Sequence, residues 1–299
     1  MKAITVLASA KVNLFLQITG RRDDGYHLLE SLFAFADFGD KITVTESEEI
    51  TFSVTGPFAD ICKLARCDGM TNIAAKAAIG LKALSGENKG VNIVLEKNLP
   101  LSAGLGGGSS DAAATLKALQ ILWKTEIDEE RLFDFSLELG ADVPACLVGE
   151  PSFVSGIGEH ITPVNDFPDL YCVLANPKKP LSTPAVFKAF AIAGRPFTQP
   201  LALTPELNEG IWPLLEGTRN DLEKPAIKLL PEIKDILDSI RKQDGCRIAR
   251  MSGSGATCFG LFEDEGEAAV AAAKITHDNP AWWVVDGCLS AKPRFLLHA

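Results

Sequence analysis

A short glycine-rich stretch has the composition of a site that binds anions. Between Gly104 and Ser110, four glycines and two serines lead directly into an alanine-rich segment, which predicts a helix that begins at Ser109 or Ser110. Glycine lets the backbone approach a phosphate with its N–H groups turned inward, and a helix N-terminus adds unpaired N–H donors and the positive end of the helix dipole. We therefore expect this loop to bind a polyphosphate.

Two better-known phosphate loops do not match this stretch. A Walker loop needs Lys followed by Ser or Thr after its last glycine, but Gly108 is followed by two serines and the next lysine is Lys117. The dinucleotide fingerprint starting at Gly104 requires Gly or Ala at the position of Ser109, which disfavours an NAD-binding enzyme. A flexible linker is also disfavoured, because strong helix formers follow at once.

A lysine stands in the middle of an apolar segment near the start of the sequence. From Ala8 to Leu16 every even-numbered position is apolar, so alternation predicts a strand with Lys11 and Asn13 on the same face. An unpaired ammonium group is costly to bury. The face that carries Lys11 is therefore either open to solvent or directed into a cleft that holds an anion or a carboxylate.

An aspartate after a predicted helix has two possible roles. Asp142 follows the helix end at Gly140 and precedes Pro144, a position that suits the N-cap of a new helix. A carboxylate at the mouth of a cleft could equally accept a proton from a substrate hydroxyl. The sequence leaves both roles open.

Two other short segments could contribute to a binding site. Tyr26 and His27 follow a turn, and they either stack on and hydrogen-bond a base or are ordinary surface residues. The small-residue loop 252–256 is either a tight hairpin or a second wall of the polyphosphate site. No histidine spacing typical of zinc sites and no G-x-S-x-G elbow of a serine hydrolase occurs.

Length and composition restrict the class of protein. The 299 residues suffice for two medium domains, and the net charge of −10 argues against nucleic acid as the main partner. Seven scattered cysteines and the lack of a long apolar run indicate a reducing, cytoplasmic setting without membrane contact. The first residues resemble a short signal peptide, but the apolar pattern continues as a strand would.

Strands and helices alternate without regular βαβ units, which favours an α+β fold. We expect strands over 5–18, 28–38 and 41–46, a helix over 72–83, and one long amphipathic helix over 226–242. The pattern of elements starts again after Pro151. We therefore predict a first domain over 1–155 and a second over 156–299.

Five segments in order resemble the GHMP kinase superfamily. They are A-S-A-K-V-N around Lys11, G-Y-H around Tyr26, the loop L-P-x-x-x-G-L-G-G-G-S-S-D-A-A, G-A-D-V-P around Asp142, and S-G-S-G-A at 252–256. The resemblance implies a first half like the second domain of ribosomal protein S5 and a ferredoxin-like second half, with ligands in the cleft between them. It further implies ATP and Mg²⁺ as cofactors.

The implied reaction transfers the γ-phosphoryl group of ATP to the 2-hydroxyl of a small molecule, a cytidine diphosphate methylerythritol. Asp142 then becomes the base and Lys11 the cation that orients it and stabilises the transferring group. No carboxylate matches a Mg²⁺ ligand, so Ser109 or Ser110 with water is expected to serve. A mevalonate- or homoserine-type kinase and a catalytically silent nucleotide-binding regulator of the same fold remain alternatives, and the oligomeric state is expected to be monomer or homodimer.

The same resemblance assigns the remaining binding residues. Tyr26 and Phe187 would stack on the cytosine, His27 would read its polar edge, and Asn13 would lie beside the reacting end, with Thr183 and Pro184 nearby. Lys97 and Asn72 would lie near the adenine. The loop expected to hold the ATP phosphates comprises Pro100, Leu101, Ser102, Ala103, Gly104, Leu105, Gly106, Gly107, Gly108, Ser109 and Ser110.

Overall fold

Eleven strands form one hydrogen-bonded system in the computed structural model, which describes residues 3–201, 207 and 210–291 and the backbone of 296–298. The main path of neighbouring strands is β11-β1-β2-β10-β7-β9-β8, and β4 and β5 also pair with β2. The strands are β1 (Ala3–Arg21), β2 (His27–Ser47), β3 (Ile50–Thr55), β4 (Gly90–Glu96), β5 (Ser152–Gly156), β6 (His160–Pro163), β7 (Leu170–Asn176), β8 (Ile248–Met251), β9 (Cys258–Phe262), β10 (Trp283–Leu289) and β11 (Leu296–His298).

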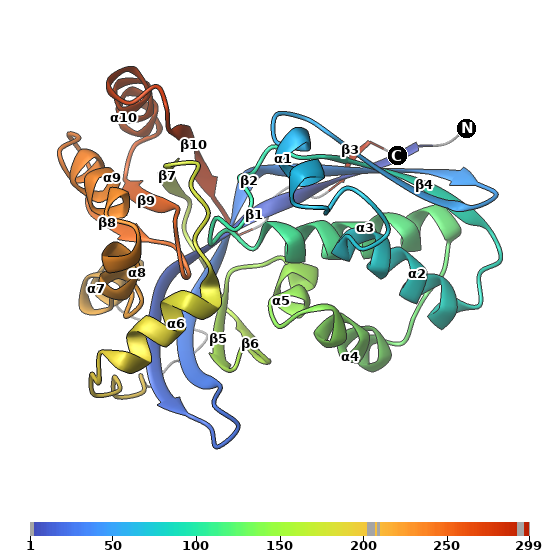
Figure 1. Cartoon of the computed structure of the whole chain (residues 1–299), viewed down its shortest axis with the longest axis horizontal. Helices are drawn as coiled ribbons and strands as arrows, with labels where there is room; N and C mark the ends of the chain where they lie inside the picture. Colours follow the sequence, from blue (N-terminus) through green and yellow to red (C-terminus); the bar gives the residue numbers. More distant parts are fainter. Residues whose placement is uncertain (1–2, 202–206, 208–209, 292–295, 299) are drawn as a thin grey trace.

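The long hairpin of β1 and β2 runs through the middle of the molecule, with one group of helices at each end (Figure 1). One group covers the sheet formed with β3 and β4, and the other packs around β7 to β10. The helices are α1 (Ala59–Leu64), α2 (Ile73–Ser85), α3 (Gly107–Trp123), α4 (Glu129–Leu139), α5 (Val143–Val148), α6 (Thr183–Ile192), α7 (Ile211–Gly217), α8 (Glu223–Leu229), α9 (Glu232–Arg241) and α10 (Glu265–Asp278).

The central strand β1 is buried along almost its whole length, from Val6 to Ile18. Helix α3 packs on it from the first half of the chain, and the backbone of Leu16 pairs with Arg219 and Asp221 from the second half. The strand therefore belongs to the cores of both halves. A side chain in this buried stretch of β1 is therefore enclosed by both halves of the chain.

A β-bulge lies beside Lys11. Ser9 pairs with Gly39 and Lys11 pairs with Phe35, so two steps along β1 match four steps along β2. This irregularity involves residues 36–38, at the end of the strand that we predicted over 28–38; that strand and the one predicted over 41–46 in fact form the single strand β2. Bulges redirect side chains and are frequent beside active sites.

The predicted helix over 226–242 is wrong, because the chain forms two helices there. Helix α8 ends at Leu229 and α9 begins at Glu232, with Leu230 in an extended conformation (φ −141°, ψ 89°) before Pro231. Proline has no N–H to continue the ladder, and it disfavours the helical conformation of the residue before it. The apolar periodicity continues across this break and obscures it in the sequence.

The division predicted at residue 155 stays a prediction. Strand β5 spans that position, and the terminal strand β11 pairs with β1 of the first half. The outermost residues of the two predicted domains, 1 and 299, lie outside the described part of the chain. The α+β class is confirmed by the mixture of mostly antiparallel strands and helices.

None of the helices in the described ranges combines the length and the apolar character that crossing a bilayer would require.

Candidate active site

One large pocket lies between the two halves, and nearly all of the predicted site residues line it. Its volume is about 1320 Å³, above the ~300–1,000 Å³ typical of a site for one small molecule. It therefore has room for two ligands side by side. Of the residues predicted from the sequence, only Ser110 is absent from its wall, because Ser110 is buried and its hydroxyl faces Cys146.

Three carbonyl groups of the glycine-rich loop, which lines this pocket, are bound by other parts of the protein. The carbonyl oxygens of Ala103, Gly104 and Leu105 accept hydrogen bonds from Thr257 N–H (3.0 Å), the Ser252 hydroxyl (2.8 Å) and Lys11 N–H (2.9 Å). Three consecutive acceptors are thus removed from the ligand side. The backbone groups of the loop that are left for a ligand are then its N–H groups, and N–H donors suit an anion.

Helix α3 begins at Gly107, two residues before the predicted start. Gly106 is its N-cap with a left-handed conformation (φ 60°), and Ser110 N–H is the first to reach back, to the carbonyl oxygen of Gly106. The N–H groups of Gly107, Gly108 and Ser109 precede that first bond, so they belong to the unpaired first turn of the helix. The positive end of the helix dipole therefore lies at the pocket wall.

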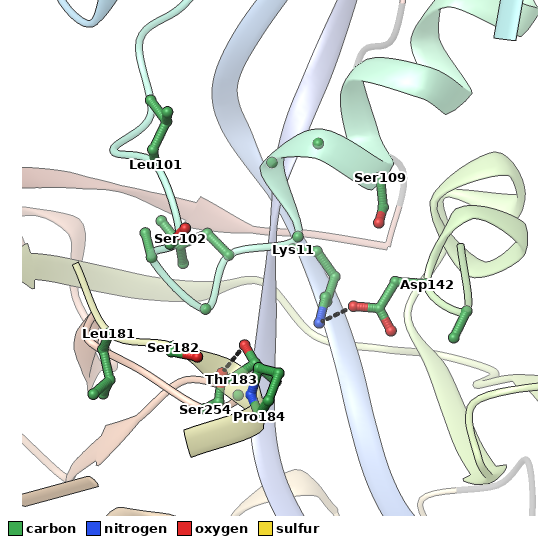
Figure 2. A pocket seen from close by; sticks show the side chains of 18 of the residues that line it. Lys11, Leu101, Ser102, Ser109, Asp142, Leu181, Ser182, Thr183, Pro184 and Ser254 are labelled. Carbon is green, nitrogen blue, oxygen red and sulfur yellow. Dashed lines mark hydrogen bonds and ion pairs between the residues drawn. The ribbon is translucent and has the colours of Figure 1, made fainter. Parts of the chain in front are cut away.

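The loop 252–256 is a second wall of the site rather than an isolated hairpin. A Cβ atom on Gly104 would lie 2.4 Å from the carbonyl oxygen of Ser252, so the two loops are packed backbone against backbone. The hydroxyl of Ser254 is 2.7 Å from that of Thr183 at the start of α6, as Figure 2 shows. The sequence had left this alternative open.

We expect Gly104→Ala to raise the KM for ATP by about tenfold or more. Gly104 has φ +75°, and any side chain there meets the Ser252 carbonyl, so the loop must move away from its supports. Steady-state kinetics with varied ATP would measure the change. Gly86→Ala is a matched control, because Gly86 has nearly the same φ (+70°) but nothing within 4 Å of an added Cβ. An equal KM for ATP in the two variants would contradict this account.

Lys11 and Asp142 form an ion pair in the pocket, with Lys11 Nζ 3.0 Å from Asp142 Oδ2 (Figure 2). The Lys11 side chain is 5% exposed and that of Asp142 is 35% exposed, so the carboxylate faces the open space. Lys11 Nζ also donates to Asn13 Oδ1 (2.8 Å) and lies over the ring of Phe33. The predicted shared face of Lys11 and Asn13 is therefore present, and it opens into a cleft.

Asp142 occupies the N-cap position of α5, but its side chain makes no capping hydrogen bond. By contrast, Asp128 caps α4 by accepting from Arg131 N–H at 3.2 Å. The carboxylate of Asp142 is directed to Lys11 and the pocket instead. The helix N-cap role therefore does not account for this aspartate.

The pocket is also lined by the aromatic side chains of Tyr26, His27 and Phe187. His27 stacks on Phe187 with a centroid distance of 5.4 Å and an interplanar angle of 28°, and Phe190 meets His27 edge-on. Burial and, to a lesser degree, the positive charge of Arg21 lower the pKa of His27, so its imidazole is neutral at pH 7. Tyr26 is exposed at the rim. A neutral imidazole both donates and accepts hydrogen bonds, as the edge of a nucleobase requires.

The two residues predicted near the adenine have other contacts. Asn72 caps α2 by accepting from Ala74 N–H, and it donates to the carbonyl of Cys67. Lys97 is buried, with its ammonium group between Asp40 and Asp111. Both line the pocket, but their polar groups already have partners within the protein.

Sequence reasoning missed the roles of Asp40 and Asp111, which support the loop without standing out in the sequence. Asp40 follows Gly39 in an apolar strand, and Asp111 was read only as part of a helix start. An acidic residue inside an apolar strand is itself a signal, because burial of a charge requires a partner. That signal indicates burial but does not identify Lys97.

No group of three or more His, Cys, Asp or Glu side chains that could hold a metal ion occurs among the described residues. A divalent cation in this pocket would therefore depend mainly on oxygen atoms of its ligands. Ser109 points its hydroxyl toward the space beside Lys11 and Asp142 (Figure 2).

Two family models match this sequence. The model for the GHMP kinases N terminal domain matches residues 72–150, and that for the GHMP kinases C terminal matches residues 206–280. The 4-diphosphocytidyl-2-C-methyl-D-erythritol kinase of Paramagnetospirillum magneticum is 45% identical over 95% of this chain and 98% of its own length. The protein of the same name from Chelativorans sp. is also 45% identical, over 93% of each chain.

Solved structures agree with these matches. A crystal structure of 4-(cytidine 5'-diphospho)-2C-methyl-D-erythritol kinase superposes with a TM-score of 0.80 at 36% identity, covering 96% of this chain and all of that one. Homoserine kinase from Cytophaga hutchinsonii superposes with a TM-score of 0.70 at 18% identity, covering 98% of this chain and 96% of that one. The second likeness concerns the fold alone.

Proposed function

This chain belongs to the GHMP kinases, in the group of 4-diphosphocytidyl-2-C-methyl-D-erythritol kinases, and from that membership we propose how its residues carry out the reaction. The enzyme transfers the γ-phosphoryl group of ATP to the 2-hydroxyl of 4-diphosphocytidyl-2-C-methyl-D-erythritol, a step of isoprenoid precursor synthesis by the non-mevalonate route. The Lys11–Asp142 pair, facing the same pocket as a glycine-rich loop, is the observation that carries the proposed mechanism.

In this proposal the stretch from Pro100 to Ser109 holds the ATP phosphates. Ser110, which is buried, supports this stretch from within the protein. The backbone N–H groups of the loop and of the first turn of α3 bind the phosphate oxygens, because the loop carbonyls are occupied by Lys11, Ser252 and Thr257. Phosphoryl transfer passes through a loose transition state, so fixed donors that stabilise charge are the main catalytic need. Lys97 and Asn72 border the nucleoside end of ATP.

Asp142 is the proposed base. Its carboxylate takes the proton of the substrate 2-hydroxyl as that oxygen forms a bond to the γ-phosphorus and the bond to the bridging oxygen of ADP breaks. Lys11, held by Asn13, fixes the orientation of Asp142 and contributes positive charge beside the transferring group. A general base contributes about 10²–10⁴-fold to such a reaction.

Mg²⁺ is the proposed metal cofactor, bound through the triphosphate, water and the hydroxyl of Ser109, which faces the same space. It would neutralise part of the negative charge of the triphosphate. This arrangement agrees with the absence of a cluster of three metal-ligating side chains from the described residues.

Tyr26, His27 and Phe187 are the proposed cytidine site, with Thr183 and Pro184 at the adjoining start of α6. Tyr26 and Phe187 supply the aromatic faces, and the neutral ring of His27 binds the polar edge of the base. This aromatic group and the glycine-rich loop line the same large pocket. In this proposal the acceptor alcohol and ATP bind in one cavity, and each is held by different helices, strands and loops.

We expect Phe187→Ala to raise the KM for the cytidine substrate, because stacking of a base on an aromatic ring is worth about 1–3 kcal/mol, or roughly 5- to 150-fold. The KM for ATP should stay unchanged. Phe197→Ala is the control, since Phe197 is also partly exposed but lies outside the pocket wall. A rise in the KM for ATP equal to that for the cytidine substrate would contradict the assignment.

The experiment that tests the function compares acceptor alcohols with ATP as the phosphoryl donor. The panel contains 4-diphosphocytidyl-2-C-methyl-D-erythritol, methylerythritol phosphate without the cytidine, mevalonate and homoserine. We expect turnover only with the first compound. Equal kcat/KM for mevalonate or homoserine, or no need for the cytidine group, would overturn the function, and lack of transfer to any alcohol would favour a silent regulator.

A further inference from the structure

A buried group of three charged side chains lies directly behind the glycine-rich loop. Lys97, at the end of β4, makes ion pairs with Asp40 on β2 and with Asp111 on α3, the latter at 2.9 Å. All three side chains are at most 6% exposed. The backbone of Lys97 is fixed as well, because its N–H donates to Thr55 and its carbonyl accepts from Phe58.

These contacts join the two ends of the loop. At its start, Asp40 Oδ1 accepts from the N–H groups of Asn98 (2.5 Å) and Leu99 (2.8 Å). At its end, Asp111 stands in the second turn of α3 and binds Lys97. Lys97 Nζ bridges the two carboxylates, so one ammonium group connects the residues before the loop with the helix after it.

The first turn of α3 rests on this group. A Cβ atom on Gly107 would lie 3.1 Å from Lys97 Nζ and 3.6 Å from Asp40 Oδ2. Gly107 lines the pocket and is the first residue of α3, so its N–H belongs to the unpaired first turn. A shift of the charged group therefore moves the donors that bind phosphate.

Stability alone does not explain three buried charges at this place. When all three groups are ionised they carry a net charge of −1, and apolar side chains of similar volume often replace buried ion pairs without loss of stability. Asp111 Oδ1 moreover has no hydrogen-bond partner in the described part of the chain. What the group supplies is a fixed distance between two backbone segments.

We propose that Asp40, Lys97 and Asp111 form a clamp that sets the geometry of the glycine-rich loop and thereby the affinity of the enzyme for ATP. They are positioning residues in this proposal, which rests on the proposed function because ATP is the ligand concerned. The clamp acts through the loop and not by contact with the phosphates.

The clamp also links ATP affinity to pH. Burial, reinforced by the charge of Asp40 and opposed by Lys97, raises the pKa of Asp111 to about 8. Burial opposes the charge of Lys97, but the carboxylates of Asp111 and Asp40 outweigh it and raise the pKa of Lys97. Cys62 on α1 is a further titratable neighbour; burial and, to a lesser degree, its interaction with Cys67 raise its pKa to about 12, so it stays neutral.

The direction of the pH effect follows from these groups. Below pH 8 Asp111 holds a proton and the clamp is neutral, whereas above pH 8 it carries a net negative charge behind the N-terminus of α3. A negative charge there repels the phosphates of ATP. Because the pKa of Asp111 is higher in the folded than in the unfolded chain, its contribution to stability is also greatest at low pH and is lost as pH rises through about 8.

Two substitutions of Asp111 test the clamp in the full-length enzyme. Asp111→Asn keeps an oxygen that accepts from Lys97 but removes the titration, so its KM for ATP at pH 7 should stay within about twofold of wild type. The wild-type KM for ATP should rise about three- to tenfold between pH 7 and pH 9, and that of Asp111→Asn should stay level. Asp111→Ala removes the contact and should raise the KM for ATP about tenfold, with an unchanged KM for the cytidine substrate.

Leu119→Val is the control for a general loss of stability, because Leu119 is buried on the same helix away from the loop. It should lower the melting temperature without changing either KM. The clamp would be overturned if Asp111→Ala had the same KM for ATP as the wild-type enzyme. It would also be overturned if the KM for ATP of Asp111→Asn changed with pH in the same way as that of the wild-type enzyme. If Asp111→Ala fails to fold, the pH profile of Asp111→Asn still decides.

A failure of the proposed function is distinguishable from a failure of the clamp. The wild-type enzyme is first assayed with the cytidine substrate. If it transfers no phosphate, the function fails, and binding of a non-hydrolysable ATP analogue to wild type and to the Asp111 variants, measured by calorimetry, tests the clamp separately. Equal affinities of wild type and Asp111→Ala for the analogue would overturn it.

Discussion

Replacing Asp142 by asparagine is expected to lower kcat by about 10²–10⁴-fold, the usual contribution of a general base. The amide keeps the shape of the side chain and an oxygen that can accept from Lys11 Nζ, now 3.0 Å from Asp142 Oδ2. What it loses is the capacity to take the proton of the substrate 2-hydroxyl. The KM values for ATP and for the cytidine substrate should change little. Single-turnover and steady-state kinetics would measure the effect.

Asp128→Asn provides a matched control for that experiment. Asp128 is also an aspartate at a helix N-cap, but its carboxylate binds Arg131 N–H and lies outside the pocket wall. This variant should keep the wild-type kcat. Full turnover by Asp142→Asn would show that Asp142 is not the base, and an equal loss in the two variants would indicate a structural effect of the substitution.

Replacing Lys97 by methionine is expected to lower the free energy of unfolding by about 3–5 kcal/mol, the usual cost of removing one partner from a buried charge group. Methionine has a similar length but no charge, so Asp40 and Asp111 would face one another without the ammonium group. Urea denaturation at pH 7 would measure the loss.

Lys41→Met is the comparison for that stability measurement. Lys41 on β2 forms an ion pair with Glu96, the last residue of β4 and the residue before Lys97. Both side chains of this pair are 42% exposed. Exposed ion pairs contribute about 0–1 kcal/mol. A loss below about 1 kcal/mol for Lys97→Met would contradict the view that the buried group holds the loop in place.

Local signals in the sequence identified the parts of the site that depend on local backbone geometry. The glycines around Gly106 predicted an anion-binding loop before a helix, and the alternation of apolar residues predicted the shared face of Lys11 and Asn13. The structure contains the glycine loop before α3 and the shared face, while anion binding by the loop stays a prediction. These features could be predicted because each depends on residues only a few positions apart in the sequence.

Contacts between segments far apart in the sequence could not be predicted in this way. Ser252 accepts from Asn13 N–H across 239 residues and donates to Gly104, and nothing in a small-residue loop specifies that partner. The ion pairs of Lys97 with Asp40 and with Asp111 connect the end of β4 with β2 and with α3. The break at Pro231 was missed for a different reason, since the apolar periodicity of α8 continues in α9.

The central claim is that Asp142, held by Lys11, lies where the acceptor hydroxyl meets the ATP phosphates. A crystal structure with a non-hydrolysable ATP analogue and 4-diphosphocytidyl-2-C-methyl-D-erythritol bound together tests it most directly. We predict a distance of about 2.6–3.2 Å between an oxygen of the Asp142 carboxylate and the substrate 2-hydroxyl oxygen. A 2-hydroxyl that lies beyond hydrogen-bond reach of Asp142, with the γ-phosphate bound away from the glycine-rich loop, would contradict the account.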